Sequence, residues 1–301
     1  MPILFTLGTL ALVIFLGWFA RYLKILSSAH TRGMSSYIYY FALPALFFEQ
    51  ITRTDLTTID SKIIIGSIAP ILALVALLLL LHLVKILSKE NFVLLALAIV
   101  FGSNAFFGIT FFQAFAGAAG LKFAVISSSV LGPVGIALTI YLFEYATAHG
   151  KAWCFCGKIL RNPLIISILA GVVFSILKIP LTPILDAAAM LGQTAGPLAI
   201  FALGAFIFEN FSLTEFKKSL PFSIFRLLAL PAATFLLLNF WLKPTGNLNE
   251  FLLLQSGIPA AISLSVFAER YNFRVATISN FVVGTSLGSF VIIGIAYFLV
   301  N

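Results

Sequence analysis

Charged residues are scarce in this chain: they make up 9% of its 301 residues, whereas 61% are hydrophobic. A soluble domain carries about 25% charged and about 45–50% apolar residues. This chain has too few charges to cover a surface that faces water. The scarcity excludes a soluble enzyme, a nucleic-acid module and a disordered chain. It predicts an integral membrane protein whose outer surface contacts lipid.

Cysteine is also nearly absent, because Cys154 and Cys156 are the only two. A Cys-x-Cys pair without a second cluster of Cys or His is a weak metal-binding signal and would form a strained disulfide. We therefore expect loop thiols with no assigned chemistry, no metal site and no cofactor. A positively charged leader and a small-residue cleavage site are missing as well, so residues 3–26 are interpreted as a retained helix.

The net charge of +8 does not indicate nucleic-acid binding. The 18 Lys and Arg residues are scattered singly and in pairs between apolar stretches, whereas a nucleic-acid interface needs a clustered basic face. Most of them fall in the odd-numbered loops between the spans identified next. Because positive loops stay in the cytoplasm, we expect a multi-pass protein of the plasma membrane with both termini outside.

Spanning helices need about 20 mostly apolar residues. Ten segments meet this requirement, and their connections are mostly short, so we expect one all-helical membrane domain. The predicted spans cover residues 3–26, 34–52, 62–87, 91–117, 121–146, 162–180, 183–208, 217–241, 248–270 and 275–300.

The two halves of the chain are weakly similar. The second and seventh spans each carry a proline about halfway along, Pro44 and Pro197. The fourth and ninth spans are each interrupted by Gly, Pro, amide and hydroxyl residues. Five spans is an odd number, so a second copy must enter the membrane in the opposite orientation. The prediction is a 5+5 inverted repeat over about residues 1–150 and 160–301, with broken fourth and ninth helices that cross.

Matched interruptions of this kind point to the binding site of a secondary transporter. A broken helix leaves backbone N–H and C=O groups unpaired, which lipid tolerates only where the break lines a cavity or meets a counterpart. Half-helix N-termini then attract an anion, while unwound carbonyls can hold a cation. The alternative is that Gly and Pro are simply frequent in spanning helices.

Candidate site residues follow from these breaks, since polar groups are costly in lipid. They either contact substrate or only satisfy the broken backbone. Arg226 could be a counter-ion for an anion or could snorkel towards the cytoplasmic interface. Surface positions are favoured for Glu49 and Glu269, although a carboxylate near a crossing could bind H⁺ or Na⁺. The substrate-binding candidates are Ser103, Asn104, Gly108, Gln255, Ser256, Pro259 and Ser263, and the ion or counter-ion candidates are Glu269, Arg226 and Gln113.

The ninth span also resembles a known family. Gly257-Ile258-Pro259-Ala260-Ala261-Ile262-Ser263 runs into Ala268-Glu269-Arg270-Tyr271, and the stretches that begin at Asn162, Pro197 and Phe41 look like signatures of the same kind. These residues resemble the auxin efflux carrier family, which includes malate or malonate permease-like bacterial transporters. The resemblance implies ten spans with crossing fourth and ninth helices, a fold shared distantly with bile-acid/sodium symporters.

Several positions depart from the family pattern. Ser263 and Glu269 stand where the family usually has Asn and Gln, and Ser103, Ala105 and Thr110 stand where Asn, Gly and Pro are expected. Because these positions lie near the expected crossing, the resemblance implies the fold of the family but does not identify the substrate.

The function expected from the sequence is secondary active transport of a small organic anion, auxin- or malate-like, by alternating access. Coupling to H⁺ or Na⁺ would drive it, the lipid bilayer surrounds it, and the protein could form a homodimer. The alternative is a channel or membrane sensor that binds a small ligand without coupled turnover. An enzyme is disfavoured because the spans contain no catalytic motif, and His30, His82 and His149 lie unpaired near span ends.

Overall fold

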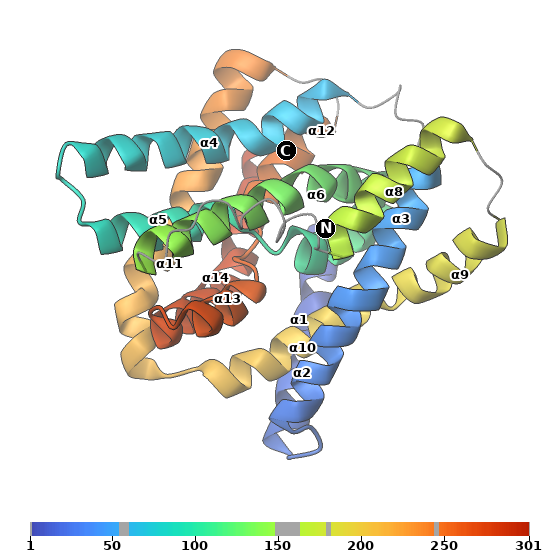
Figure 1. Cartoon of the computed structure of the whole chain (residues 1–301), viewed down its shortest axis with the longest axis horizontal. Helices are drawn as coiled ribbons and strands as arrows, with labels where there is room; N and C mark the ends of the chain where they lie inside the picture. The colour runs from blue at the N-terminus through green and yellow to red at the C-terminus, as the bar shows by residue number, and fades with distance from the viewer. Residues whose placement is uncertain (1, 54–59, 148–162, 179–181, 244–246, 301) are drawn as a thin grey trace. The chain divides into compact units, whose positions relative to one another are not determined.

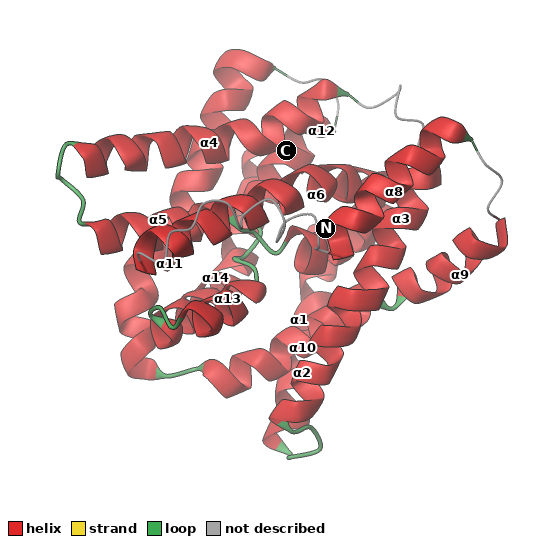
Figure 2. Cartoon of the chain, in the orientation of Figure 1, coloured by secondary structure: helices red, strands yellow, loops and turns green. Residues whose placement is uncertain are grey.

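The chain is helical throughout the part that the computed structural model describes, which comprises residues 2–53, 60–147, 163–178, 182–243 and 247–300. These ranges contain no strand, as Figures 1 and 2 show, and the one extended contact is an antiparallel pairing of Gly102 with Ala260. The predicted all-helical class is therefore confirmed for the described residues.

The helices follow one another with short connections. Three of the elements are π-helical turns, labelled η, in which the backbone hydrogen bond reaches five residues back. In chain order the elements are α1 (Pro2–Tyr22), α2 (Ser28–Tyr37), η1 (Ile38–Ala42), α3 (Leu43–Arg53), α4 (Ser61–Leu83), α5 (Lys89–Val100), η3 (Asn104–Gly108), α6 (Ile109–Thr147), α8 (Pro163–Leu177), α9 (Thr182–Gln193), α10 (Ala195–Asn210), α11 (Leu213–Leu237), η5 (Leu238–Leu242), α12 (Leu248–Ser256), α13 (Ser263–Tyr271) and α14 (Val275–Val300).

Six helical stretches in the described residues are long and apolar enough to cross a membrane. The predicted interruptions are present: α5 ends at Val100 and the helix resumes at Asn104, while α12 ends at Ser256 and α13 begins at Ser263. The expected division between the fourth and fifth spans lies inside α6, where Ala116 and Gly117 leave helical geometry. The count of ten spans and the inverted orientation of the halves stay predictions.

The chain divides into two compact units, and each takes segments from both halves of the sequence. Unit 1 comprises Met1–Asp60, Ala105–Gly132 and Cys156–Glu209, and unit 2 comprises Ser61–Asn104, Pro133–Phe155 and Asn210–Asn301. The predicted single domain remains a prediction, and the two units are described separately.

Identical tetrapeptides follow α1 and α4. Lys-Ile-Leu-Ser occupies residues 24–27 and 85–88. Both lysines adopt left-handed backbone geometry, with φ of 60° and 62°. The leucine two residues later donates its N–H back into the helix, from Leu26 to Ala20 at 3.3 Å and from Leu87 to Leu81 at 3.2 Å. This bond satisfies a carbonyl at the helix end. The two identical sequences therefore fold into the same helix-ending turn.

Left-handed residues recur at corresponding places in the second half. Lys178 follows α8 with φ of 51°, and Lys243 follows η5 with φ of 38°. Gly117 with φ of 57° and Asn272 with φ of 48° follow the two interrupted helices. The turns after the first, third and fourth predicted spans of each half thus each contain a residue with positive φ, which agrees with an internal repeat.

The two prolines expected at mid-span act differently. Pro44 is the second residue after η1, and the Leu43 N–H before it donates to the Ile38 carbonyl five residues back. Because proline lacks an N–H, this wider turn accommodates Pro44 within continuous helix from residue 28 to residue 53. Pro197 lies in the first turn of α10, where no N–H partner is needed. Pro197 therefore lies where one helix, α9, ends and the next, α10, begins, whereas Pro44 lies inside continuous helix.

Helices α1 and α10 pack closely in unit 1 through two glycines. A side chain at Gly17 would collide with the backbone of Phe201, and one at Gly204 would collide with the backbone of Ile14. The Arg21 Nε lies 2.6 Å from Glu209 Oε1 near the end of the same helix pair. Small residues allow helix backbones to approach in this way where hydrophobic burial contributes little.

Replacing Gly17 with alanine should destabilise unit 1, because the new Cβ meets the Phe201 backbone. The cost should be at least about 1–3 kcal/mol, as for other overpacked positions. Gly8→Ala in the same helix is the matched control: nothing lies within 4 Å of its added Cβ, so it should raise stability by about 0.5–1 kcal/mol. Thermal unfolding in detergent measures both. Equal shifts in the two variants would contradict the close approach of α1 and α10.

Candidate functional site

Two interrupted helices meet at their breaks in unit 2. The Ser103 N–H donates to the Pro259 carbonyl at 2.8 Å, and the Ala261 N–H donates to the Phe101 carbonyl at 3.0 Å. These two bonds flank the antiparallel pairing of Gly102 with Ala260. Each break therefore supplies backbone partners for the other, which is how a helix interruption can exist away from water.

Proline and neighbouring side chains explain the break after α12. Pro259 has no N–H to continue a helix. The N–H of the next residue, Ala260, instead donates to Thr285 Oγ1 of α14 at 3.2 Å. Thr285 is completely buried and belongs to the site, yet sequence reasoning missed it. Its only signal is a hydroxyl in the middle of the last apolar span.

Arg226 of α11 reaches the same crossing. Its side chain is 2% exposed. Nη1 donates to the Ala98 carbonyl and, at 3.3 Å, to that of Ile99. Nη2 donates to the carbonyls of Ile258 at 2.9 Å and Pro259 at 3.3 Å. The guanidinium thus binds the carbonyl ends of both interrupted helices. It does not snorkel, which corrects one of the two alternatives that the sequence left open.

Glycine leaves room for this guanidinium. A Cβ built on Gly102 would lie 2.7 Å from Arg226 Nη2 and 2.9 Å from Asn104 Nδ2. Both atoms are nearer than ordinary contacts of a real Cβ. An alanine at position 102 would therefore force the guanidinium of Arg226 or the amide of Asn104 to shift.

Two polar residues of α12 lie at its end, as predicted. Gln255 is 6% exposed, its Oε1 accepts a hydrogen bond from Ser67 Oγ of α4 at 3.1 Å, and its Nε2 has no partner among the described residues. Ser256 is equally buried, but its hydroxyl donates to the Leu253 carbonyl at 2.5 Å. Gln255 thus has a spare buried donor, whereas Ser256 satisfies its own helix.

The other predicted residues fall into three groups. Asn104 and Ser263 are half-buried and begin the helical segments that follow the two breaks. Gly108 ends η3 and is buried in unit 1. The side chain of Glu269 lies outside the described residues, as do Cys154 and Cys156.

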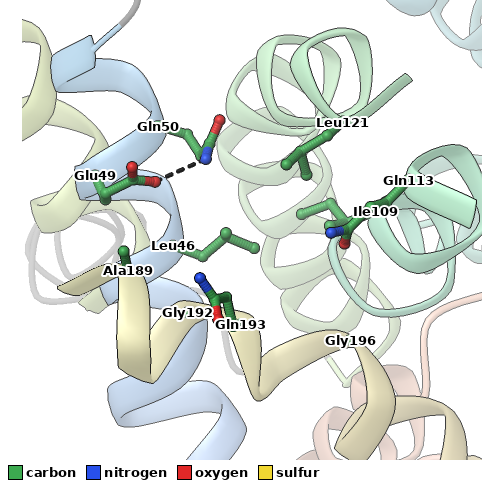
Figure 3. A pocket seen from close by; sticks show the side chains of 10 residues that line it. All are labelled: Leu46, Glu49, Gln50, Ile109, Gln113, Leu121, Ala189, Gly192, Gln193 and Gly196. Atoms are coloured by element: carbon green, nitrogen blue, oxygen red, sulfur yellow. Dashed lines mark hydrogen bonds between the residues drawn. The ribbon is translucent and has the colours of Figure 1, made fainter. Parts of the chain in front are cut away.

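A separate cavity of about 180 Å³ lies within unit 1. Figure 3 shows that Glu49 and Gln50 of α3, Gln113 of α6 and Gln193 of α9 bring polar groups to it. The Gln50 Nε2 donates to Glu49 Oε2 at 2.7 Å, drawn as a dashed line in Figure 3. Gln113, predicted as an ion or counter-ion residue, therefore lines this cavity.

Glu49 is buried, although the sequence favoured a surface position for it. Its side chain is 7% exposed, and its Oε1 lies 2.7 Å from Arg53 Nε one turn later. Arg53 also contacts Asp186 of α9 at 3.1 Å. The arginine spans both carboxylates, and this ion pairing allows a charged group to lie inside an apolar unit.

Apolar helices that span a bilayer, with two interrupted helices paired at their breaks, define a multi-pass membrane protein of the transport class. The family model described as membrane transport protein matches residues 2–154 and 152–297. The chain therefore belongs to this membrane transport family, which is the auxin efflux carrier family, and the resemblance found in the sequence is confirmed. It is a transport family and not an enzyme family. A comparison with curated proteins finds none that matches.

Gly102→Ala should destabilise unit 2 by about 1–3 kcal/mol, because its Cβ would displace the guanidinium of Arg226 from the carbonyls. Gly294→Ala in α14 is the matched control, since nothing lies within 4 Å of the Cβ added there. Thermal unfolding of the purified protein compares the two. A Gly102→Ala variant as stable as the control would contradict the described packing at the crossing.

Proposed function

We propose that this membrane transporter is a secondary carrier that moves a small organic anion by alternating access, with its substrate site at the crossing in unit 2. The observation that carries the proposal is the pairing of the two breaks through Ser103, Pro259, Phe101 and Ala261. Interrupted helices in a transporter supply polar backbone near the middle of the bilayer, where a substrate must be bound.

The charges around the crossing favour an anion. The carbonyl ends of α5 and α12 carry partial negative charge, and Arg226 binds both of them. The segments that begin at Asn104 and Ser263 have the opposite polarity, because the N-terminal end of a helix carries partial positive charge. Once the negative ends are neutralised, the positive ends dominate the local potential, and this supports a carboxylate substrate.

Side-chain amides add donors to this site. The Gln255 Nε2 is buried and has no partner in the described part of the chain, while Asn104 is the first residue after the other break. An unsatisfied buried donor costs free energy until an acceptor reaches it. A substrate carboxylate would be such an acceptor, so we assign Gln255 and Asn104 to substrate binding.

We further propose a coupling ion, a membrane and an orientation for this carrier. Coupling to an H⁺ or Na⁺ gradient would drive the substrate, and the protein would lie in the plasma membrane with both termini outside. The distribution of Lys and Arg supports this orientation.

Alanine substitutions of residues at the crossing should abolish transport. We expect Asn104→Ala and Pro259→Ala proteins in liposomes to lose uptake of a labelled dicarboxylate, because one loses an amide donor and the other a fixed interruption of the helix. Asn239→Ala is the control, since the exposed Asn239 amide only donates to the Phe235 carbonyl of its own helix. Unchanged flux in both crossing variants would disprove the site.

Counterflow separates a carrier from a channel or a ligand-binding sensor. Liposomes preloaded with unlabelled substrate should accelerate entry of labelled substrate, since a carrier returns faster when loaded on both sides. A pore shows no such acceleration, and a sensor shows binding without flux. Either result would overturn alternating access for this protein.

A further inference from the structure

Four backbone carbonyls converge at the crossing within unit 2. Ala98 and Ile99 belong to the last turn of α5, and Ile258 and Pro259 follow Gly257, the residue that caps α12. Carbonyls at a helix end have no partner within the helix and carry partial negative charge. Bringing two such ends together is unfavourable in a medium of low dielectric constant unless a positive group lies between them.

In discontinuous transporter helices, unwound carbonyls and half-helix C-terminal ends can coordinate a cation such as Na⁺. Here the guanidinium of Arg226 makes those contacts. Nη1 binds the α5 side, and Nη2 binds the α12 side at 2.9 and 3.3 Å. A planar guanidinium with five donors is suited to spanning two groups of acceptors, whereas the ammonium of a lysine is a single point of charge.

The burial of Arg226 and the space beside Gly102 show that the fold accommodates a guanidinium at this position. Arg226 is among the largest fully buried side chains of the described residues, at 2% exposure. Gly102 leaves room for Nη2, because a Cβ there would lie 2.7 Å from it. No ion pair joins Arg226 to a carboxylate in the described part of unit 2. Its charge is balanced by carbonyl dipoles.

Three carboxylates of unit 2 have other partners. Glu90 contacts Arg274 at 2.5 Å, Glu215 contacts Lys218 at 2.7 Å, and Glu144 accepts a hydrogen bond from Tyr271 at 2.9 Å. These contacts leave the helix ends as the counter-charge of the guanidinium. The arrangement resembles a cation held by carbonyl oxygens more than a salt bridge.

We infer that Arg226 is a tethered cation that occupies the place of a metal ion between the carbonyl ends of α5 and α12. The crossing is therefore assembled without Na⁺, and a coupling ion, if transport uses one, binds elsewhere. This inference goes beyond the proposed function because it concerns how the crossing is held together, and its test needs no substrate.

The test compares thermal unfolding of the purified full-length protein in sodium chloride and in N-methylglucamine chloride at equal ionic strength. Sodium bound at a site elsewhere would stabilise the native protein and Arg226→Met alike, so sodium should not stabilise the native protein more than it stabilises Arg226→Met. Arg226→Met, which keeps much of the side-chain volume without the charge, should unfold at a lower temperature. Arg226→Ala should also unfold earlier and should be partly restored by millimolar methylguanidinium, which fits the vacated space. Arg270→Ala is the control, since Arg270 is an exposed residue of α13.

Three results would overturn the inference. Stabilisation by sodium over N-methylglucamine that is lost in Arg226→Met would place a metal ion at the crossing in addition to the arginine. An Arg226→Met protein as stable as the native one would show that the charge is dispensable. An Arg226→Ala protein that gains nothing from methylguanidinium would assign the residue a packing role alone.

Should Arg226→Ala fail to fold, Arg226→Lys gives the decisive comparison, because lysine keeps the charge but cannot bind both carbonyl groups in the same fork. We expect an unfolding temperature between those of Arg226→Met and the native protein. An Arg226→Lys protein with the same unfolding temperature as the native protein would contradict the bridging role. Because unfolding is measured without transport, a failure of this inference is distinguishable from a failure of the proposed function.

Discussion

Partnering of backbone polar groups in a medium without water is the constraint on which this structure depends. A helix that stops inside an apolar unit exposes carbonyls and N–H groups that lipid cannot satisfy. The chain solves this by placing one break against the other, so that Ser103 and Ala261 donate across the crossing. Thr285 and Arg226 supply partners for backbone groups that remain.

Close packing explains three of the glycines. Gly102 admits the guanidinium at the crossing, and Gly17 and Gly204 let α1 and α10 approach each other in unit 1. These positions are not interchangeable with Gly8 or Gly294, which have open space around them. Composition alone does not separate the two kinds, since each is a glycine in an apolar run.

Much of the helical content was predictable from apolar run length, and so were the two interruptions, because Gly, Pro and amide residues are conspicuous against an apolar background. Local turns were less evident. The repeated Lys-Ile-Leu-Ser turns and the π-helical turn before Pro44 depend on backbone geometry that side-chain periodicity does not report. Glu49 was expected at a surface because it lies near the end of a span, yet its pairing with Arg53 allows it to be buried.

The sequence by itself determined the membrane class, the helical architecture, the family and the places where two helices break, because each follows from composition or from motifs close together in the chain. Only the tertiary structure decided what Arg226 does. Its carbonyl partners lie 128 residues before it and 32 residues after it, so nothing near the arginine in sequence identifies them. A long charged side chain in an apolar helix can reach an interface or an internal acceptor, and the folded positions of those acceptors make the choice.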